Sequence, residues 1–314
     1  MEKIGFIGLG RMGLGMASNM QKKGFSLVVH DVNGAAVDRL VELGAEAGGS
    51  AADVAAQVDI LITMLPNSAI VREVICGPGG VLSGIKPGAL VMDMSTVSPE
   101  TTDAVAAECA AHGVGFVDAP VGRLASHADA GQSLFMVGAS KADFDRVRPA
   151  MEAMGTTIYH CGETGAGTRT KIVNNFLAIS LCQLNAEAMT LMQGFGLDLE
   201  NTLDVLHGTT ATNGQLKVNW ATKSLIGDIE PGFTIDLAHK DLTLVMEAAN
   251  AARVPMPMAG AAREMFSQAR AQGKGGIDFS GMLDQSEDAS FSVKSGECEL
   301  SFRIQGETAT APLH

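Results

Sequence analysis

The chain has 314 residues, of which 46% are hydrophobic and only 4% aromatic, so its cores must consist mainly of aliphatic side chains and methionine. This length is sufficient for two domains with buried cores. The 22 basic and 35 acidic residues give a net charge of -13, which argues against nucleic acid or an anionic membrane surface as a partner. A small anionic substrate would therefore need a local positive site.

The cysteines and histidines indicate the cellular compartment and bear on whether the protein binds a metal. The five cysteines have neither paired spacing nor a C-x-x-C motif, which indicates free thiols in a reducing compartment. The sequence shows no leader peptide and no apolar run long enough to cross a membrane, so we expect a cytoplasmic protein. The histidines lack metal-ligand spacing, and no metal site is expected.

The first strong motif is the segment IGFIGLGRMG at residues 4–13, in which an apolar strand runs into G-x-G-x-x-G. The first glycine permits the tight turn, the second lets the backbone approach a diphosphate, and the third lets the next helix pack closely on the strand. An acidic residue ends the second apolar run, where it can accept from ribose hydroxyls and favour NAD over NADP; a plain helix-capping role is the alternative. The expected cofactor contacts are Gly8, Gly10, Arg11, Met12, Gly13 and Asp31.

Strands and helices alternate along the first half of the chain. Apolar runs before turn signals predict strands at residues 4–7, 26–30, 60–64, 89–94 and 115–117. Ser98 can cap the helix after the fourth of these, with Pro99 at its first position. This alternation predicts an α/β fold with a doubly wound parallel sheet of the Rossmann type, whose ligands bind where strands end.

The second half looks all-helical. A glycine-rich entry leads into a long helix at residues 168–194, and the domains are expected at residues 1–163 (dinucleotide binding), 164–195 (connecting helix) and 196–290 (helical substrate and oligomerisation domain). Residues 291–314 form a tail of uncertain structure. It is either disordered or contains a short strand in which Cys298, Leu300, Phe302 and Ile304 alternate with polar residues. Such a strand could pair with Phe291 and Val293 in a hairpin across residues 295–296.

A polar stripe near the start of the long helix carries the candidate chemistry. Helical spacing places Asn174 and Asn175 on the same face as Lys171, while most of the remaining surface is apolar. One interpretation is a water-facing lysine with two amides. The other is a catalytic site, because the positive end of a helix dipole disfavours an ammonium group and so favours proton donation to a carbonyl oxygen.

With these motifs in view, residues 3–283 resemble the β-hydroxyacid dehydrogenase family, which includes 3-hydroxyisobutyrate dehydrogenase. The resemblance rests on six ordered motifs, namely IGFIGLGRMG at residues 4–13, MLP at 64–66, DMST at 93–96, DAPV at 118–121, GAGTRTKIVNN at 165–175 and DLAHKDL at 236–242. It implies that Lys171 is the catalytic acid/base with Asn175 beside it. It also implies that Thr96, Leu65 and Lys240 lie against the nicotinamide cofactor, Thr96 also near the substrate.

One loop departs from the family pattern. Most members have Ser-Gly-Gly after the Pro-Val, but this chain has Gly122-Arg123-Leu124. The guanidinium of Arg123 offers a fork of donors suited to sulfonate, phosphate or carboxylate. The loop is similar to that of the branch of the family that reduces 3-sulfolactaldehyde to 2,3-dihydroxypropane-1-sulfonate, in which the arginine meets the sulfonate and the counterpart of Asn174 helps to hold the substrate.

The resemblance therefore predicts an NADH-dependent reductase of a short anionic hydroxyaldehyde, assembled as a homodimer or homotetramer. Three alternatives stay open. Arg123 could be a surface arginine paired with a carboxylate. The substrate could carry a carboxylate, as do 3-hydroxyisobutyrate, tartronate semialdehyde and succinic semialdehyde. A nucleotide-sensing binding protein without chemistry is the non-enzyme alternative.

Overall fold

The computed structural model describes residues 2–283, 299–304 and 307–312. It consists of two compact units, Met1–Asn174 and Asn175–His314, and the division falls within the long helix α8 (Ala166–Gly194). Each unit is described separately.

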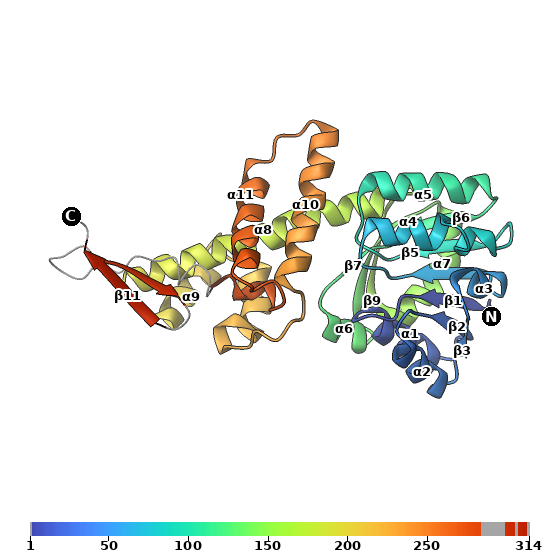
Figure 1. Ribbon diagram of the computed structural model, residues 1–314, viewed down its shortest axis with the longest axis horizontal. Helices are drawn as coiled ribbons and strands as arrows, with labels where there is room; N and C mark the ends of the chain where they lie inside the picture. Colours follow the sequence, from blue (N-terminus) through green and yellow to red (C-terminus); the bar gives the residue numbers. More distant parts are fainter. Residues whose placement is uncertain (1, 284–298, 305–306, 313–314) are drawn as a thin grey trace. The chain divides into compact units, whose positions relative to one another are not determined.

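The first unit is built on a nine-stranded sheet with the order β3-β2-β1-β4-β5-β6-β8-β7, in which β9 pairs with β8 (Figure 1). The six strands from β3 to β6 are all parallel, whereas β8 runs antiparallel to β6 and β7. The order reverses between β1 and β4, which is the switch point where doubly wound sheets bind ligands. The strands are β1 (Ile4–Ile7), β2 (Leu27–His30), β3 (Glu46–Ala47), β4 (Ile60–Thr63), β5 (Leu90–Asp93), β6 (Gly115–Asp118), β7 (Val121–Gly122), β8 (Ser133–Gly138) and β9 (Gly155–Gly162).

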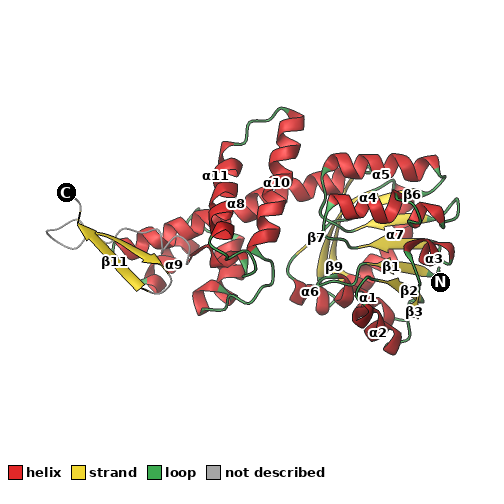
Figure 2. Ribbon diagram, in the orientation of Figure 1, coloured by secondary structure: helices red, strands yellow, loops and turns green. Residues whose placement is uncertain are grey.

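Helices cover both faces of this sheet, as the red ribbons around the yellow strands show (Figure 2). Alternate residues of β1 feed two separate cores: Phe6 packs with α1 and α7 residues on one face, and Ile7 packs with α3, α4 and α5 residues on the other. The helices are α1 (Gly13–Lys22), α2 (Gly34–Glu42), α3 (Ala51–Ala56), α4 (Ser68–Cys76), α5 (Pro99–Ala111), α6 (Ala125–Asp129) and α7 (Lys141–Met154).

Local signals start several of these helices. The Ser98 hydroxyl accepts a hydrogen bond from Thr101 N–H, and Pro99 occupies the first turn of α5, as the sequence predicts. The five predicted strands are present as β1, β2, β4, β5 and β6. The sequence analysis did not predict β3, β7, β8 and β9, so the sheet is wider than expected.

The second unit is helical over residues 175–283. It contains the rest of α8, α9 (Leu199–Gly208), α10 (Ile235–Ala252) and α11 (Pro257–Ala271), with a π-helical turn at Gln215–Asn219. Its core surrounds the single tryptophan, Trp220, which is fully buried against α8, α10 and α11 residues. None of the helices among the described residues is long and apolar enough to cross a membrane.

Two further strands, β10 (Glu299–Ile304) and β11 (Glu307–Pro312), pair antiparallel with each other. Of the two interpretations of the tail, β10 fits the short strand at residues 298–304. Its partner is β11; Phe291 and Val293, the partner considered from the sequence, lie outside the described residues.

Candidate functional site

The glycine turn after β1 has the geometry that each glycine's position predicts. Gly8 has a positive φ of 98°, and a Cβ there would lie 2.2 Å from the Met64 carbonyl oxygen. A Cβ on Gly13 would lie 1.9 Å from the Gly8 carbonyl oxygen, so α1 can pack here only with glycine. A Cβ on Gly10 would meet nothing within 4 Å. The open space at Gly10, beside the first turn of α1, fits a diphosphate approaching the helix N-terminus.

Asp31 lies directly after β2 and reaches back to this turn. Its carboxylate accepts from Leu9 N–H at 2.5 Å and from Asn33 N–H at 2.7 Å. The cap of α2 is Asn33, whose side chain accepts from Ala35 N–H. The capping alternative for Asp31 is therefore wrong, and the carboxylate stands beside the glycine turn, where a ribose would extend from a bound diphosphate.

Arg11 and Met12 lie between the glycines and the first turn of α1. Arg11 is exposed, and its guanidinium is 3.9 Å from the Asp129 carboxylate at the end of α6. Met12 is half-buried against the first core. Both positions stay predictions as cofactor contacts.

A buried carboxyl group connects the ends of β4 and β5. Asp93 Oδ1 accepts from the hydroxyls of Thr63 (2.8 Å) and Ser95 (2.6 Å). The Ser95 hydroxyl oxygen in turn accepts from Leu65 N–H at 2.8 Å. Burial raises the pKa of Asp93. This network fixes the two loops that carry Leu65 and Thr96, both half-buried at the carboxyl edge of the sheet.

A second buried carboxyl group holds the start of α8. Asp118, at the end of β6, accepts from Gly165 N–H and Thr168 N–H, both at 2.6 Å. These are N–H groups that a helix start leaves without an internal partner, so Asp118 caps α8 from a distant part of the chain. Burial raises the pKa of Asp118 to about 6, although these donors favour its charged form.

Helix α5 adds two lateral contacts to the same helix start. The Thr102 and Thr168 hydroxyls are 3.0 Å apart, and the Arg169 guanidinium forms a two-pronged ion pair with Asp103 at 2.8 and 3.0 Å. Consecutive residues of α8 thus contact consecutive residues of α5. The first turn of α8 is thereby fixed immediately before Lys171.

Lys171 is half-buried, and Asn175 follows one turn later on the same continuous helix, about 6 Å along its axis. Asn174 is exposed. Asn175 is only 5% exposed, and its amide nitrogen donates to Asp241 Oδ2 of α10 at 2.6 Å. Lys240 Nζ is 2.9 Å from Asp241 Oδ1. In the second unit, Asp241 therefore brings the predicted residues Asn175 and Lys240 together.

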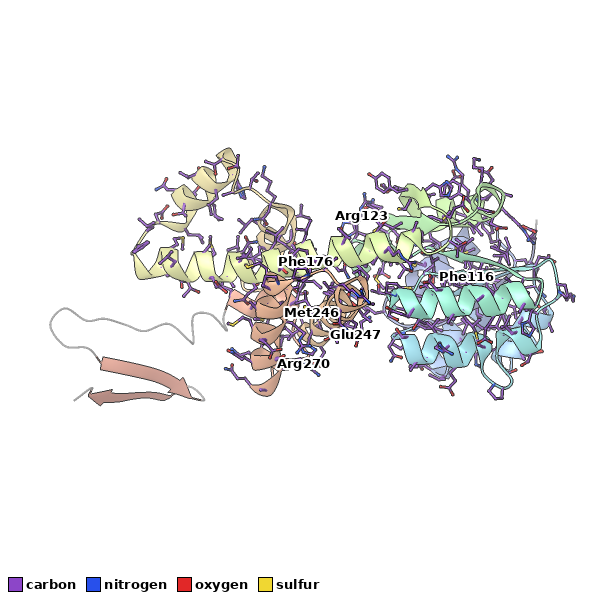
Figure 3. All side chains as sticks on the ribbon, turned by 90° about the horizontal axis from the view of Figure 1, so that it is seen from above. Phe116, Arg123, Phe176, Met246, Glu247 and Arg270 are labelled. Atoms are coloured by element: carbon purple, nitrogen blue, oxygen red, sulfur yellow. The ribbon has the colours of Figure 1, made fainter. Side chains whose placement is uncertain are left out.

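Arg123 follows β7 and is labelled in Figure 3. Its φ of 74° is the left-handed conformation that a glycine, the usual residue of the family pattern, adopts without strain; for arginine it costs about 1 kcal/mol. The guanidinium donates to three neutral oxygens: Gln132 O (2.6 Å), Thr156 Oγ1 (3.0 Å) and Thr157 Oγ1 (3.1 Å). Within residues 2–283 no carboxylate lies within ion-pair distance of it, which argues against the paired-surface alternative.

Several residues of the site were not assigned a role from the sequence. Asp93, Asp118 and Asp241 stand in motifs that carried the family resemblance, but each has a partner distant in sequence, namely Thr63, Gly165 and Asn175 respectively. Gly122, in the loop that departs from the family pattern, stays a prediction as a substrate contact; a Cβ there would make ordinary contacts with Leu134 and Met136. His239 of α10 forms hydrogen bonds with Ser267 and Arg270 of α11, which indicates a structural role. No group of three or more potential metal ligands occurs in the part of the chain that the structure describes.

Two family models match residues 3–285 almost continuously. Residues 3–162 match the NAD binding domain of 6-phosphogluconate dehydrogenase, and residues 165–285 match the family described as NAD-binding of NADP-dependent 3-hydroxyisobutyrate dehydrogenase. The 3-sulfolactaldehyde reductase of Escherichia coli is 43% identical over 285 residues, covering 91% of this chain and 96% of the relative. The 2-(hydroxymethyl)glutarate dehydrogenase of Eubacterium barkeri is 41% identical, covering 90% and 93%.

Among solved structures, the 3-hydroxyisobutyrate dehydrogenase of Mycobacterium tuberculosis with L-serine superposes with a TM-score of 0.85 at 32% identity, covering 91% of this chain and 99% of that one. The same two-part fold is thus matched over both units. The chain belongs to the 3-hydroxyisobutyrate dehydrogenase-like family of β-hydroxyacid dehydrogenases, which are NAD(P)-dependent oxidoreductases acting on CH–OH groups.

Proposed function

We propose that this protein is an NADH-dependent reductase of a short anionic hydroxyaldehyde, with 3-sulfolactaldehyde as substrate and 2,3-dihydroxypropane-1-sulfonate as product. The observation that carries the choice is Arg123, a cation bonded only to neutral oxygens among the described residues. In a chain of net charge -13, such an uncompensated guanidinium is a suitable site for a strong oxyanion. The 3-sulfolactaldehyde reductase at 43% identity supports the same substrate class.

The division of chemical roles follows from the helix. Bound NADH would supply a hydride to the carbonyl carbon. Lys171 donates a proton to the carbonyl oxygen as negative charge develops there. Asn175, one turn further along, holds the same oxygen or orients the lysine, and its amide is itself fixed by the bond to Asp241. Asn174, Gly122 and Thr96 are proposed to line the substrate, and Leu65, Thr96 and Lys240 the nicotinamide.

We propose NAD rather than NADP as the cofactor. The Asp31 carboxylate would accept from ribose hydroxyls but repel a 2′-phosphate. The next residue, Val32, is fully exposed and offers no positive charge to a phosphate. A comparison of NADH with NADPH at equal concentration tests this directly. We further propose a cytoplasmic location, because Cys76, Cys109, Cys161 and Cys182 are all unpaired.

A second candidate substrate carries a carboxylate, because a guanidinium binds either anion as a fork. The Eubacterium barkeri 2-(hydroxymethyl)glutarate dehydrogenase and the Pseudomonas aeruginosa L-serine dehydrogenase, 41% and 37% identical, support this alternative. The non-enzyme alternative, a nucleotide-sensing protein, would retain cofactor binding without turnover.

We also propose self-association through α8. Leu177, Leu184 and Leu191 recur at intervals of seven residues, so they form one stripe along the helix, and Phe195 follows directly after its end. These four side chains are 43% to 69% exposed. The buried face of α8, with Cys182 and Met189, points to the core of its own unit. A second copy of the chain would cover the stripe in a homodimer, or in a homotetramer built from dimers.

The experiment that tests the proposed function is NADH oxidation by the purified protein against sulfolactaldehyde, succinic semialdehyde, tartronate semialdehyde and methylmalonate semialdehyde, compared by kcat/KM. A clear preference for the sulfonate supports the proposal, and a preference for a carboxylate moves the enzyme to another substrate within the family. Absence of turnover with all four, together with NADH binding, would favour the sensing alternative.

A further inference from the structure

Strand β9 contains an irregularity next to Arg123. In the pairing of β8 with β9, Ser133 is opposite Gly155, and the next residue, Leu134, is opposite Thr157. Thr156 is therefore an extra residue, a β-bulge with no partner of its own on β8. In a regular strand Thr156 and Thr157 would point to opposite faces of the sheet. The bulge re-aims one of them, and both hydroxyls reach the same guanidinium, at 3.0 and 3.1 Å.

The strand register places this contact beyond the carboxyl edge of the parallel sheet. Asp118, the last residue of β6, is opposite Gly138, and the chain then continues along β8 until Gly122 is opposite Leu134. Four residues of extended chain past Asp118 correspond to about 13 Å. Strands β7, β8 and β9 therefore extend past the carboxyl edge of the parallel strands and carry Arg123. The glycine turn after β1 and the loops after β4 and β5 lie at the same edge.

The hydrogen bonds of Arg123 use its donors selectively. Nη1 gives both its hydrogens, to Gln132 O and Thr156 Oγ1, and Nη2 gives one to Thr157 Oγ1. A guanidinium has five N–H donors, so Nε–H and one Nη2–H remain. Two donors are what a bidentate contact with an oxyanion requires. The three acceptors are neutral, so they orient the cation without cancelling its charge.

We propose that Thr156, Thr157 and the Gln132 carbonyl form a socket that orients Arg123 for the anionic group of the substrate, which makes the two threonines specificity-determining positioning residues. The inference rests on the proposed function, because it takes Arg123 as the anion site. The socket preorganises the arginine, so its hydroxyls should affect binding of the anion and leave the chemical step unchanged.

The test compares two aldehydes that differ in charge: 3-sulfolactaldehyde, and glyceraldehyde, in which a hydroxyl replaces the sulfonate. The double variant Thr156→Val/Thr157→Val removes both hydroxyls at nearly constant volume, and Thr156→Ser/Thr157→Ser keeps them. Thr222→Val, which removes an exposed hydroxyl bonded to Val218 O in the second unit, is the matched control. The valine pair, the serine pair, the control and Arg123→Gln are each made in the wild-type protein, and the valine pair is also combined with Arg123→Gln.

We expect the valine pair to raise KM for sulfolactaldehyde about tenfold, as two lost hydrogen bonds to a charged group imply, with kcat within about twofold of wild type. Its kcat/KM for glyceraldehyde should not change. The serine pair and the control should resemble wild type, and the valine pair should have no further effect when Arg123 is already glutamine.

Other outcomes overturn the proposed socket, the proposed anion site at Arg123, or both. If Arg123→Gln raises KM for the sulfonate and the valine pair does not, the socket is wrong and the anion site survives. Equal losses of kcat/KM on both aldehydes would show a merely structural role. If Arg123→Gln leaves the preference for the sulfonate intact, both claims fail. If neither aldehyde is reduced, the proposed function fails, and calorimetric titration of 2,3-dihydroxypropane-1-sulfonate into wild type and the valine pair then decides the socket, with equal or absent binding rejecting it.

Discussion

Alanine substitutions in the glycine turn should separate cofactor binding from folding. The added methyl of Gly10→Ala would meet no atom within 4 Å, and Gly10 does not have a positive φ, so the fold can accept it. The loss of unfolded-state freedom should even stabilise the protein slightly, by up to about 1 kcal/mol. The same methyl occupies the space through which a diphosphate approaches the backbone. We therefore expect the Kd for NADH to rise at least about tenfold, equivalent to about 1.4 kcal/mol.

Gly13→Ala should behave in the opposite way. Its methyl would lie 1.9 Å from the Gly8 carbonyl oxygen, a separation that real atoms do not tolerate, so α1 must move away from β1. We expect a loss of about 3 kcal/mol in the free energy of unfolding, the upper part of the range for overpacking a core. NADH binding should fall as well, but as a consequence of the damaged fold.

The assay is urea unfolding without cofactor, followed by far-UV circular dichroism, together with NADH titration by its own fluorescence. The single tryptophan, Trp220, lies in the second unit, and its emission provides an internal control for that unit. Wild-type NADH affinity in Gly10→Ala would refute the assignment of this turn to the diphosphate. A loss of stability in Gly10→Ala equal to that in Gly13→Ala would refute the steric reasoning.

Three further predictions concern other parts of the molecule. Lys171→Ala should lower kcat by about 10²- to 10⁴-fold while the Kd for NADH stays within about twofold; steady-state rates and NADH titration check this, and unchanged kcat rejects the acid role. Burial and the nearby Arg270 and Arg263 lower the pKa of His239 from 6.5, so the unfolded chain binds its proton more readily. The free energy of unfolding should therefore fall as pH drops below about 6.5. In urea titrations at several pH values, the free energy of unfolding of His239→Gln should fall less over this range than that of wild type. Leu184→Glu should dissociate the oligomer in sedimentation velocity, whereas Val41→Glu, at an equally exposed position (43%) on α2, should not; an unchanged assembly in Leu184→Glu would contradict the α8 interface.

Sequence reasoning succeeded where the signal is local. The strand, glycine turn and acidic residue that predicted the dinucleotide half of the fold lie within about 30 residues, and Ser98 with Pro99 marks a helix start by itself. Apolar strands buried on both faces are continuous runs, which is why β1, β4 and β5 could be read directly.

The parts that could not be predicted depend on long-range pairing. Asp118 caps α8 across 47 residues, and Asp241 fixes Asn175 across 66. The contacts of Arg123 with Thr156 and Thr157 depend on a bulge in β9 and join residues 33 and 34 apart in the sequence. The short β7 and the polar-edged β9 also lack the continuous apolar pattern, because they extend the sheet at its edge.

Buried carboxyl groups organise loops and helix starts within each unit, Asp93 and Asp118 in the first and Asp241 in the second. Asp93 and Asp118 accept from hydroxyl or backbone N–H groups, whereas Asp241 accepts from the Asn175 amide and forms an ion pair with Lys240. The Arg123 guanidinium donates to neutral oxygens instead, and among residues 2–283 no carboxylate lies within ion-pair distance of it. If Arg123 binds the substrate, the preference for an anionic aldehyde over a neutral one depends on the unpaired positive charge of its guanidinium. A rise in ionic strength should accordingly raise KM for an anionic aldehyde more than for a neutral one, and equal effects on both would argue against electrostatic selection.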